Sequence, residues 1–173
     1  MQSEEFDIKR YIRGSNAIEG IYDDAEIDQS LKAWEFLTKQ NEITHAVICE
    51  VQKIITANQP ELKPEHRGNY RSFCRVNVTV GGRYAPEHSM VDSLMQGWLE
   101  DLPKMQPLIG HVRFESIHPF VDGKGRPGRM TTASFISPSI TAAALATAIT
   151  PSIPGQTSLP TVIRGPPRRT PPP

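Results

Sequence analysis

The chain has 173 residues, enough for one domain with a hydrophobic core. Its 19 basic and 19 acidic residues balance, which argues against a general binder of nucleic acid or of membrane surfaces. Because the sequence has no apolar run of about eighteen residues and no apolar N-terminal segment, it predicts neither a membrane span nor a secretory signal, and we expect a cytoplasmic protein.

The first half of the chain is predicted to be helical. A short helical segment is expected over residues 15–20, with Ser15 as its N-cap and Gly20 as a glycine stop. Two amphipathic helices follow, over residues 26–40 and 43–57, because their apolar residues recur at spacings of three and four. Neighbouring amphipathic helices of this kind favour a helical hairpin.

Between residues 76 and 86 the pattern changes from helical to alternating. Valines recur at every second position, and Gly81-Gly82 predicts a tight turn. A β-hairpin this small is not stable alone, so it should lie against helices. Two more helices are expected, from about Met90 to Leu102 and from about Leu108 to Ile117, and the second leads directly into His118. The sequence therefore predicts a mainly α fold with one short hairpin.

The segment from His118 to Arg129 reads His-Pro-Phe-Val-Asp-Gly-Lys-Gly-Arg-Pro-Gly-Arg. Its glycines allow successive backbone N–H groups to converge on an anion. Arg126 and Arg129, three residues apart, supply forked donors that suit phosphate oxygens. The segment is not a Walker loop, because no Ser or Thr follows Lys124. The expected ligand is a chain of phosphates.

His118 and Asp122 are the candidate base and metal ligand of this segment. One His and one Asp form an incomplete ligand set for zinc. Mg²⁺ takes one or two protein carboxylates and completes its shell with phosphate oxygens and water. We therefore expect Mg²⁺ at Asp122, which leaves His118 as a proton acceptor near neutral pH.

The segment resembles the motif of the Fic domain family, His-Pro-Phe-x-(Asp/Glu)-Gly-Asn-Gly-Arg-x-x-Arg. The flanking sequences Gly68-Asn-Tyr-Arg-Ser and Val78-Thr-Val-Gly-Gly-Arg-Tyr-Ala-Pro also resemble the family, the second of them its flap hairpin. The likeness runs from about Ser15 to Met130. It implies a Fic-like helical bundle with the flap at residues 76–86 and the motif at residues 118–129.

The resemblance implies a protein adenylyltransferase, which moves AMP from ATP to a Tyr, Ser or Thr hydroxyl of a target protein. ATP and Mg²⁺ are the expected cofactors, neither nucleic acid nor a membrane is an expected partner, and the oligomeric state is left open. His118 would take the hydroxyl proton and Asp122 would hold Mg²⁺. The glycine-rich turn would cradle the α-phosphate, and the two arginines would hold the β- and γ-phosphates. The implied phosphate-binding positions are Gly123, Lys124, Gly125, Arg126 and Arg129.

Residues 15–20, Ser-Asn-Ala-Ile-Glu-Gly, resemble the inhibitory motif (Ser/Thr)-x-x-x-Glu-(Gly/Asn) that lies N-terminal to many Fic cores. This resemblance implies that Glu19 pairs with Arg129 and removes the γ-phosphate anchor, so that the ground state inhibits itself. In some relatives the corresponding Glu instead supports removal of AMP. A de-AMPylating reaction is therefore an alternative.

Two features depart from the family pattern. Lys124 stands where the family has Asn, and its long stem cannot reproduce a short fixed amide. After Arg129 the family continues in an apolar helix, whereas this chain continues Met-Thr-Thr-Ala-Ser. A second functional hypothesis follows: a truncated, inactive Fic remnant that binds nucleotide or serves as an interaction module.

The composition changes near residue 130. From Thr131 to Pro173 there is no Asp, Glu, Lys or His, and 9 of the 16 prolines lie there. Such a Pro-, Ser-, Thr- and Ala-rich segment favours solvated, extended backbone. We therefore predict a Fic-like domain over residues 1–130, truncated after the motif, and a disordered tail over residues 131–173. A frameshift is one hypothesis for the origin of the tail.

Overall fold

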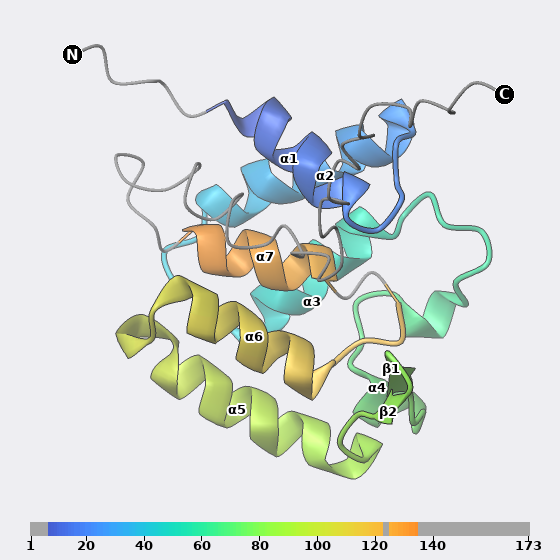
Figure 1. The fold of residues 1–173 in the computed structure, drawn as a ribbon, viewed down its shortest axis with the longest axis vertical. Helices are drawn as coiled ribbons and strands as arrows, with labels where there is room; N and C mark the ends of the chain where they lie inside the picture. Colours follow the sequence, from blue (N-terminus) through green and yellow to red (C-terminus); the bar gives the residue numbers. More distant parts are fainter. Residues whose placement is uncertain (1–6, 123–124, 135–173) are drawn as a thin grey trace, which may run out of the picture.

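The computed structural model describes residues 7–122 and 125–134 (Figure 1). This part of the chain is mainly helical, as predicted. Its α-helices are α1 (Ile8–Ala17), α2 (Asp24–Thr38), α3 (His45–Ile55), α4 (Arg71–Cys74), α5 (Val91–Asp101), α6 (Pro107–Ile117) and α7 (Gly125–Ser134). Short 3-10 turns are η1 (Pro64–His66), η2 (His88–Met90) and η3 (Leu102–Lys104). Strands β1 (Thr79–Val80) and β2 (Arg83–Tyr84) pair in antiparallel fashion.

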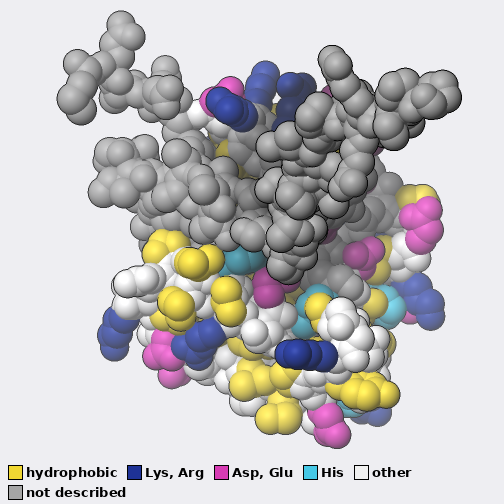
Figure 2. Space-filling model, viewed as in Figure 1, with side chains coloured by type: hydrophobic (Ala, Val, Ile, Leu, Met, Phe, Trp, Pro, Cys, Tyr) yellow, Lys and Arg dark blue, Asp and Glu magenta, His cyan; other side chains and the backbone are white. Residues whose placement is uncertain are grey.

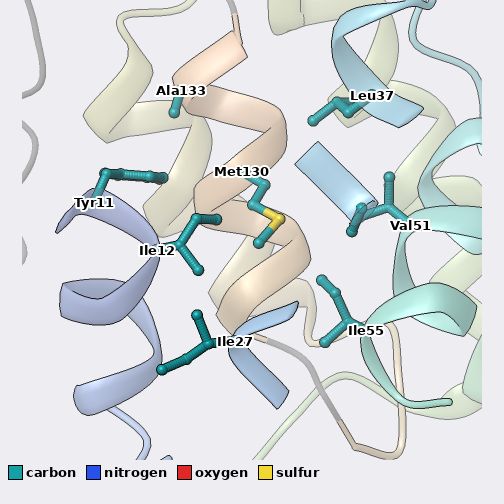
Figure 3. Packing of buried hydrophobic residues seen from close by; sticks show 9 residues of the cluster. Tyr11, Ile12, Ile27, Leu37, Val51, Ile55, Met130 and Ala133 are labelled. Carbon is teal, nitrogen blue, oxygen red and sulfur yellow. The ribbon is translucent and has the colours of Figure 1, made fainter. Parts of the chain in front are cut away.

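Helix α7 is the central helix of the described bundle and packs against α1, α2, α3 and α6 (Figure 1). Met130 of α7 is fully buried in a cluster of apolar side chains that come from α1, α2 and α3 (Figure 3). The other buried members are Tyr11, Ile12, Ile27, Ala33, Leu37, Val51, Ile55 and Ala133. The helix that carries the end of the motif is therefore also the helix around which this core forms.

A second buried cluster joins α5 and α6 and includes Phe120 of the motif. Trp98 of α5 is fully buried, and its indole N–H donates to the carbonyl of Gly110 on α6 at 2.7 Å. Phe114 of α6 packs against Gly128 of α7, where an added Cβ would lie 2.5 Å from the ring. Gly128 therefore allows α6 and α7 to approach closely, which brings the two ends of the motif together.

The two predicted amphipathic helices correspond to α2 and α3, whose ends lie within two residues of the expected ones. Side-chain caps explain where they begin. Asp23 accepts hydrogen bonds from the backbone N–H groups of Ala25 and Glu26, and Thr44 accepts one from Val47. The predicted hairpin is also confirmed, although each of its strands has only two residues.

The predicted segment over residues 15–20 is the end of a longer helix. Asp7 caps α1 by accepting from the N–H of Arg10, so the prediction that Ser15 is an N-cap was wrong. The glycine stop is confirmed: Gly20 has a φ of +73°, and the N–H of Ile21 donates to the carbonyl of Asn16. The spacing of Ile8, Tyr11 and Ile12 at three and four residues is that of a helix face, and it could have shown that the helix begins before Ser15.

Helix α6 has apolar residues on two sides. Gly110, Phe114 and Ile117 are buried, whereas Leu108, Ile109 and Val112 are exposed. Figure 2 shows apolar side chains gathered on the face that α6 presents to the viewer. None of the helices within residues 7–122 and 125–134 has the length and apolar composition needed to cross a membrane.

Helix α7 continues through the predicted domain boundary at residue 130. It extends to Ser134, and Thr131 and Thr132 are fully buried. The Thr132 hydroxyl donates to the carbonyl of Gly128 at 2.8 Å, so a threonine is accommodated inside the helix by bonding back to the preceding turn. The predicted disordered tail beyond Ser134 lies outside the described residues.

If α7 is the centre of the core, removing the Met130 side chain should destabilise the protein strongly. We expect Met130→Ala to lower the free energy of unfolding in urea by about 2–5 kcal/mol, because it leaves a cavity among α1, α2 and α3. Met90 is half exposed, so Met90→Ala should change that free energy by no more than about 0.5 kcal/mol. Equal effects of the two substitutions would contradict the central position of α7.

Candidate active site

His118 stands immediately after the last residue of α6. It has a φ of +53° and a ψ of 64°, and its N–H donates to the carbonyl of Phe114 at 2.9 Å. A left-handed conformation of this kind ends the helix and turns the chain into the motif loop. The residue is buried, with 2% of its surface exposed. The base predicted from the sequence therefore lies on rigid, packed structure.

Asp122 lies in the loop between α6 and α7 and is exposed. Its backbone carbonyl accepts a hydrogen bond from Nε2 of Gln52, a buried residue of α3, at 3.1 Å. The same amide side chain accepts from the N–H of Gly68 at 2.5 Å. Gln52 thus fixes the backbone at Asp122, although sequence reasoning had not singled it out.

The donor set at Asp122 fits a magnesium ion better than a metal enclosed by protein. In the parts of the chain that are described, no three His, Cys, Asp or Glu side chains group together as metal ligands would. Mg²⁺ needs no such group, because it keeps waters and takes oxygens from substrate phosphates. An exposed single carboxylate is compatible with that mode of binding.

Gly125 begins α7, and the two motif residues before it, Gly123 and Lys124, lie outside the described residues. An added Cβ on Gly125 would collide with a carboxylate oxygen of Glu19 and lie 2.6 Å from Nη1 of Arg129. Glycine at this position therefore makes room for a carboxylate at the N-terminus of α7. The positive end of the helix favours an anion there.

Arg129 is buried and held by both ends of the predicted inhibitory segment. Its Nη2 lies 2.5 Å from Oε1 of Glu19, so the predicted ion pair is present. Its Nε donates to the Ser15 hydroxyl at 2.7 Å, and Nη2 also donates to the Ser15 carbonyl at 3.0 Å. The Ser15 side chain therefore binds a guanidinium group instead of capping a helix. The hydroxyl of Tyr11 donates to the Arg129 carbonyl at 3.1 Å.

Arg126 is fully buried and contacts two carboxylates. Its Nη1 lies 3.1 Å from Oε2 of Glu26 on α2, and its Nε lies 3.8 Å from Oε2 of Glu19. The two oxygens of Glu19 therefore contact both arginines of the motif. Glu26 was missed in the sequence, because helical periodicity places it on α2 without indicating that it pairs with a residue 100 positions later.

Two partly exposed carboxylates and two buried guanidinium groups thus form one network, which we call the Glu19–Arg129 network: Glu19, Glu26, Arg126 and Arg129. Their formal charges cancel. Within the described residues, Nη2 of Arg126 is buried and has no hydrogen-bond partner. This N–H group could therefore donate a hydrogen bond to an additional anion, such as a phosphate oxygen.

Comparison with protein-family models gives a match to the Fic/DOC family over residues 42–136. Since the match covers more than half of the chain, the protein belongs to the Fic/DOC family. The motif, α7 and the hairpin lie inside the matched range, whereas Ser15, Glu19 and Glu26 lie before it.

A solved structure with a similar fold is a Fic family protein from Desulfovibrio desulfuricans G20. The two share 23% sequence identity with a TM-score of 0.60, over 73% of this chain and 46% of that one. At this identity the likeness shows the fold alone, and the chain spans less than half of that protein's length. The search of curated proteins found no match.

His111 of α6 has a lowered pKa, which reports on burial and on the positive charge of Arg129 nearby. Burial lowers the pKa of its imidazole from 6.5 to about 4, and the positive charge of Arg129 adds to the effect. Glu115 Oε1, at 3.9 Å from Nδ1, does not offset these two causes. Between about pH 4 and pH 6.5, His111 is therefore neutral in the folded protein and protonated in the unfolded chain.

The sign of the pH dependence follows from this lowered pKa. The contribution of His111 to stability is complete above pH 6.5 and is lost as the pH falls toward about 4, because the unfolded chain then binds the extra proton. Between pH 6.5 and about 4, the free energy of unfolding of the wild-type protein should fall by about 2–3 kcal/mol more than that of His111→Asn. Urea titrations between pH 7.5 and 3.5 would measure it. His66→Asn is the control, and the same pH profile for wild type and His111→Asn would contradict the lowered pKa.

Proposed function

We propose that this protein is an adenylyltransferase that moves AMP from ATP to a Tyr, Ser or Thr hydroxyl of a target protein. The observation that carries the proposal is the arrangement of the motif: His118 ends α6, while Arg126 and Arg129 lie in the first turns of the adjoining α7. A candidate base and two cations thus lie on two helices that pack against each other, and Asp122 lies in the segment between them. Membership of the Fic/DOC family supports a transferase as the class of activity.

In the proposed reaction, His118 accepts the proton of the target hydroxyl while the hydroxyl oxygen attacks the α-phosphorus of ATP. A new O–P bond forms, the bond between the α-phosphorus and the bridging oxygen breaks, and pyrophosphate leaves. Imidazole suits this step because it accepts protons near neutral pH. The rigid position of His118 at the end of α6 favours a fixed direction of attack.

The phosphates are proposed to bind at the start of α7. Gly123, Lys124 and Gly125 would cradle the α-phosphate, and Arg126 and Arg129 would hold the β- and γ-phosphates. The positive end of α7 and the buried guanidinium groups support this assignment. Asp122 would hold Mg²⁺, which when bound neutralises charge on the phosphates and on the leaving pyrophosphate.

Glu19 is proposed to inhibit this reaction. Its carboxylate pairs with the same guanidinium that the γ-phosphate would need, at 2.5 Å from Nη2 of Arg129. ATP cannot bind Arg129 fully unless Glu19 leaves, and a bound triphosphate would also be repelled by that carboxylate. Glu19 belongs to the segment after α1, so movement of this segment would release the inhibition.

Removing Glu19 should therefore activate the enzyme. We expect Glu19→Gly to raise the transfer of label from α-labelled ATP to protein on the order of tenfold or more, which corresponds to about 1.4 kcal/mol of relieved competition. Adding His118→Ala to this variant should abolish the transfer. Glu61→Gly, which removes an exposed carboxylate from a turn, should leave the transfer at its wild-type rate.

Three outcomes would count against the proposal. If a folded Glu19→Gly variant transfers no label, the chain is better described as an inactive Fic remnant. If the same variant removes AMP from a previously modified target but does not add it, the de-AMPylating alternative applies. If transfer survives His118→Ala, the assigned base is wrong.

The role of Asp122 can be tested through the metal requirement. In the Glu19→Gly background, Asp122→Asn should lower transfer and raise the Mg²⁺ concentration needed for half-maximal rate by roughly tenfold or more, because Mg²⁺ loses its protein carboxylate. Asp101→Asn, at an exposed position on α5, is the control. An unchanged Mg²⁺ dependence in Asp122→Asn would remove Asp122 from the metal site.

A further inference from the structure

Arg71 is a buried cation that the proposed mechanism does not use. It begins α4, and none of its surface is exposed. Across residues 7–122 and 125–134, no carboxylate forms an ion pair with it. Burying a charge without a counter-ion is costly unless its donors are used elsewhere. Among the described residues, the hydrogen-bond acceptors of the Arg71 guanidinium are all backbone carbonyls, in two other parts of the chain.

The first of these parts is the end of α6, where Arg71 binds three consecutive carbonyls. Its Nε donates to the carbonyl of His118 at 2.8 Å, and its Nη2 donates to that of Ile117 at 3.2 Å. Its backbone N–H donates to the carbonyl of Pro119 at 2.8 Å. Carbonyls at the end of a helix lack partners within the helix and carry partial negative charge, so a guanidinium suits this position.

The second part is the base of the hairpin formed by β1 and β2. Nη1 of Arg71 donates to the carbonyl of Val76, which precedes β1, at 3.3 Å. Nη2 donates to the carbonyl of Pro86, which follows β2. The N–H of Val76 returns a hydrogen bond to the carbonyl of Arg71 at 3.0 Å. One side chain therefore connects both ends of the hairpin to the backbone of His118.

Neither the backbone of His118 nor the hairpin is stable in its conformation without contacts to the rest of the protein. His118 adopts a left-handed conformation, at φ +53°, which is unfavourable for a residue with a side chain. The hairpin has strands of two residues each, too short to be stable alone. Arg71 supplies fixed, directional bonds to both, and the planar guanidinium fork has a geometry that an ammonium group cannot reproduce.

We propose that Arg71 is a positioning residue for the transfer reaction. Arg71 fixes the backbone of the base His118 and holds that backbone in one position relative to the hairpin. The inference rests on the proposed function, in which His118 takes the proton of the target hydroxyl. Small displacements of a reacting group reduce rates strongly. Loss of Arg71 should therefore slow the chemical step without removing any phosphate-binding group.

Kinetics in the Glu19→Gly background test the proposal. We expect Arg71→Met to lower kcat by roughly a hundredfold and to leave the KM for ATP within about twofold, since Arg126 and Arg129 are untouched. Arg71→Lys should lie between Arg71→Met and the parent. The matched control is Arg113→Met, which removes a half-exposed arginine of α6 that pairs with Asp101, and it should match the parent in both constants.

A second measurement does not depend on activity. The chain has five histidines, so the ring signals of His118 can be followed by nuclear magnetic resonance in histidine-labelled protein. Arg71→Lys should shift or broaden the His118 signals and leave those of His66 in place. If the Glu19→Gly parent transfers no label but the His118 signals move in this way, the proposed function fails and the positioning by Arg71 stands.

Other outcomes would overturn the proposal. Unchanged kcat together with unchanged His118 signals would show that Arg71 does not position the base. A rise in the KM for ATP at constant kcat would assign Arg71 to nucleotide binding. If neither Arg71→Lys nor Arg71→Met unfolds cooperatively, the residue serves stability alone.

Discussion

The described structure depends on the buried guanidinium of Arg129 and on the groups that satisfy it. A charge in the interior must be paired and hydrogen-bonded, and Ser15 and Glu19 supply those bonds from α1 and the turn after it. The contact thereby attaches α1 to α7, next to the apolar cluster around Met130. The fold and the state of the proposed phosphate site are consequently linked by one interaction.

The positive and negative charges of the site come from two different parts of the chain. The family match at residues 42–136 contains the cations Arg126 and Arg129, whereas the anions Glu19 and Glu26 come from the helices before it. An N-terminal segment that supplies these counter-charges can stabilise the core, and under the proposed function it also competes with a phosphate ligand. Anything that displaces this segment would expose two guanidinium groups together, and their repulsion would favour binding of a polyanion.

Local features of the fold and the site could be predicted from the sequence, because they depend on short-range patterns. The spacing of apolar residues predicted α2 and α3, and Gly81-Gly82 predicted the hairpin. The motif indicated the candidate base and the two arginines that pair with Glu19. The partners of Arg126 and Arg71 could not be predicted in this way. Glu26 lies 100 positions from Arg126, and backbone carbonyls that accept from Arg71 have no signature in residue type. The continuation of α7 past residue 130 was missed because threonine has a low helix propensity, which burial and hydrogen bonds to the preceding turn outweigh here.

We propose that Glu19 occupies the position that the γ-phosphate of ATP would take on Arg129. The most direct test compares the binding of ATP and ADP, each with Mg²⁺, to the wild-type protein and to Glu19→Gln by titration calorimetry. The wild-type protein should bind ATP and ADP with similar affinities, because Glu19 blocks Arg129. Glu19→Gln should bind ATP roughly tenfold more tightly than ADP, because only ATP carries the phosphate that Arg129 would then bind. The same ratio of ATP to ADP affinity in both proteins would show that Glu19 does not occupy the γ-phosphate position.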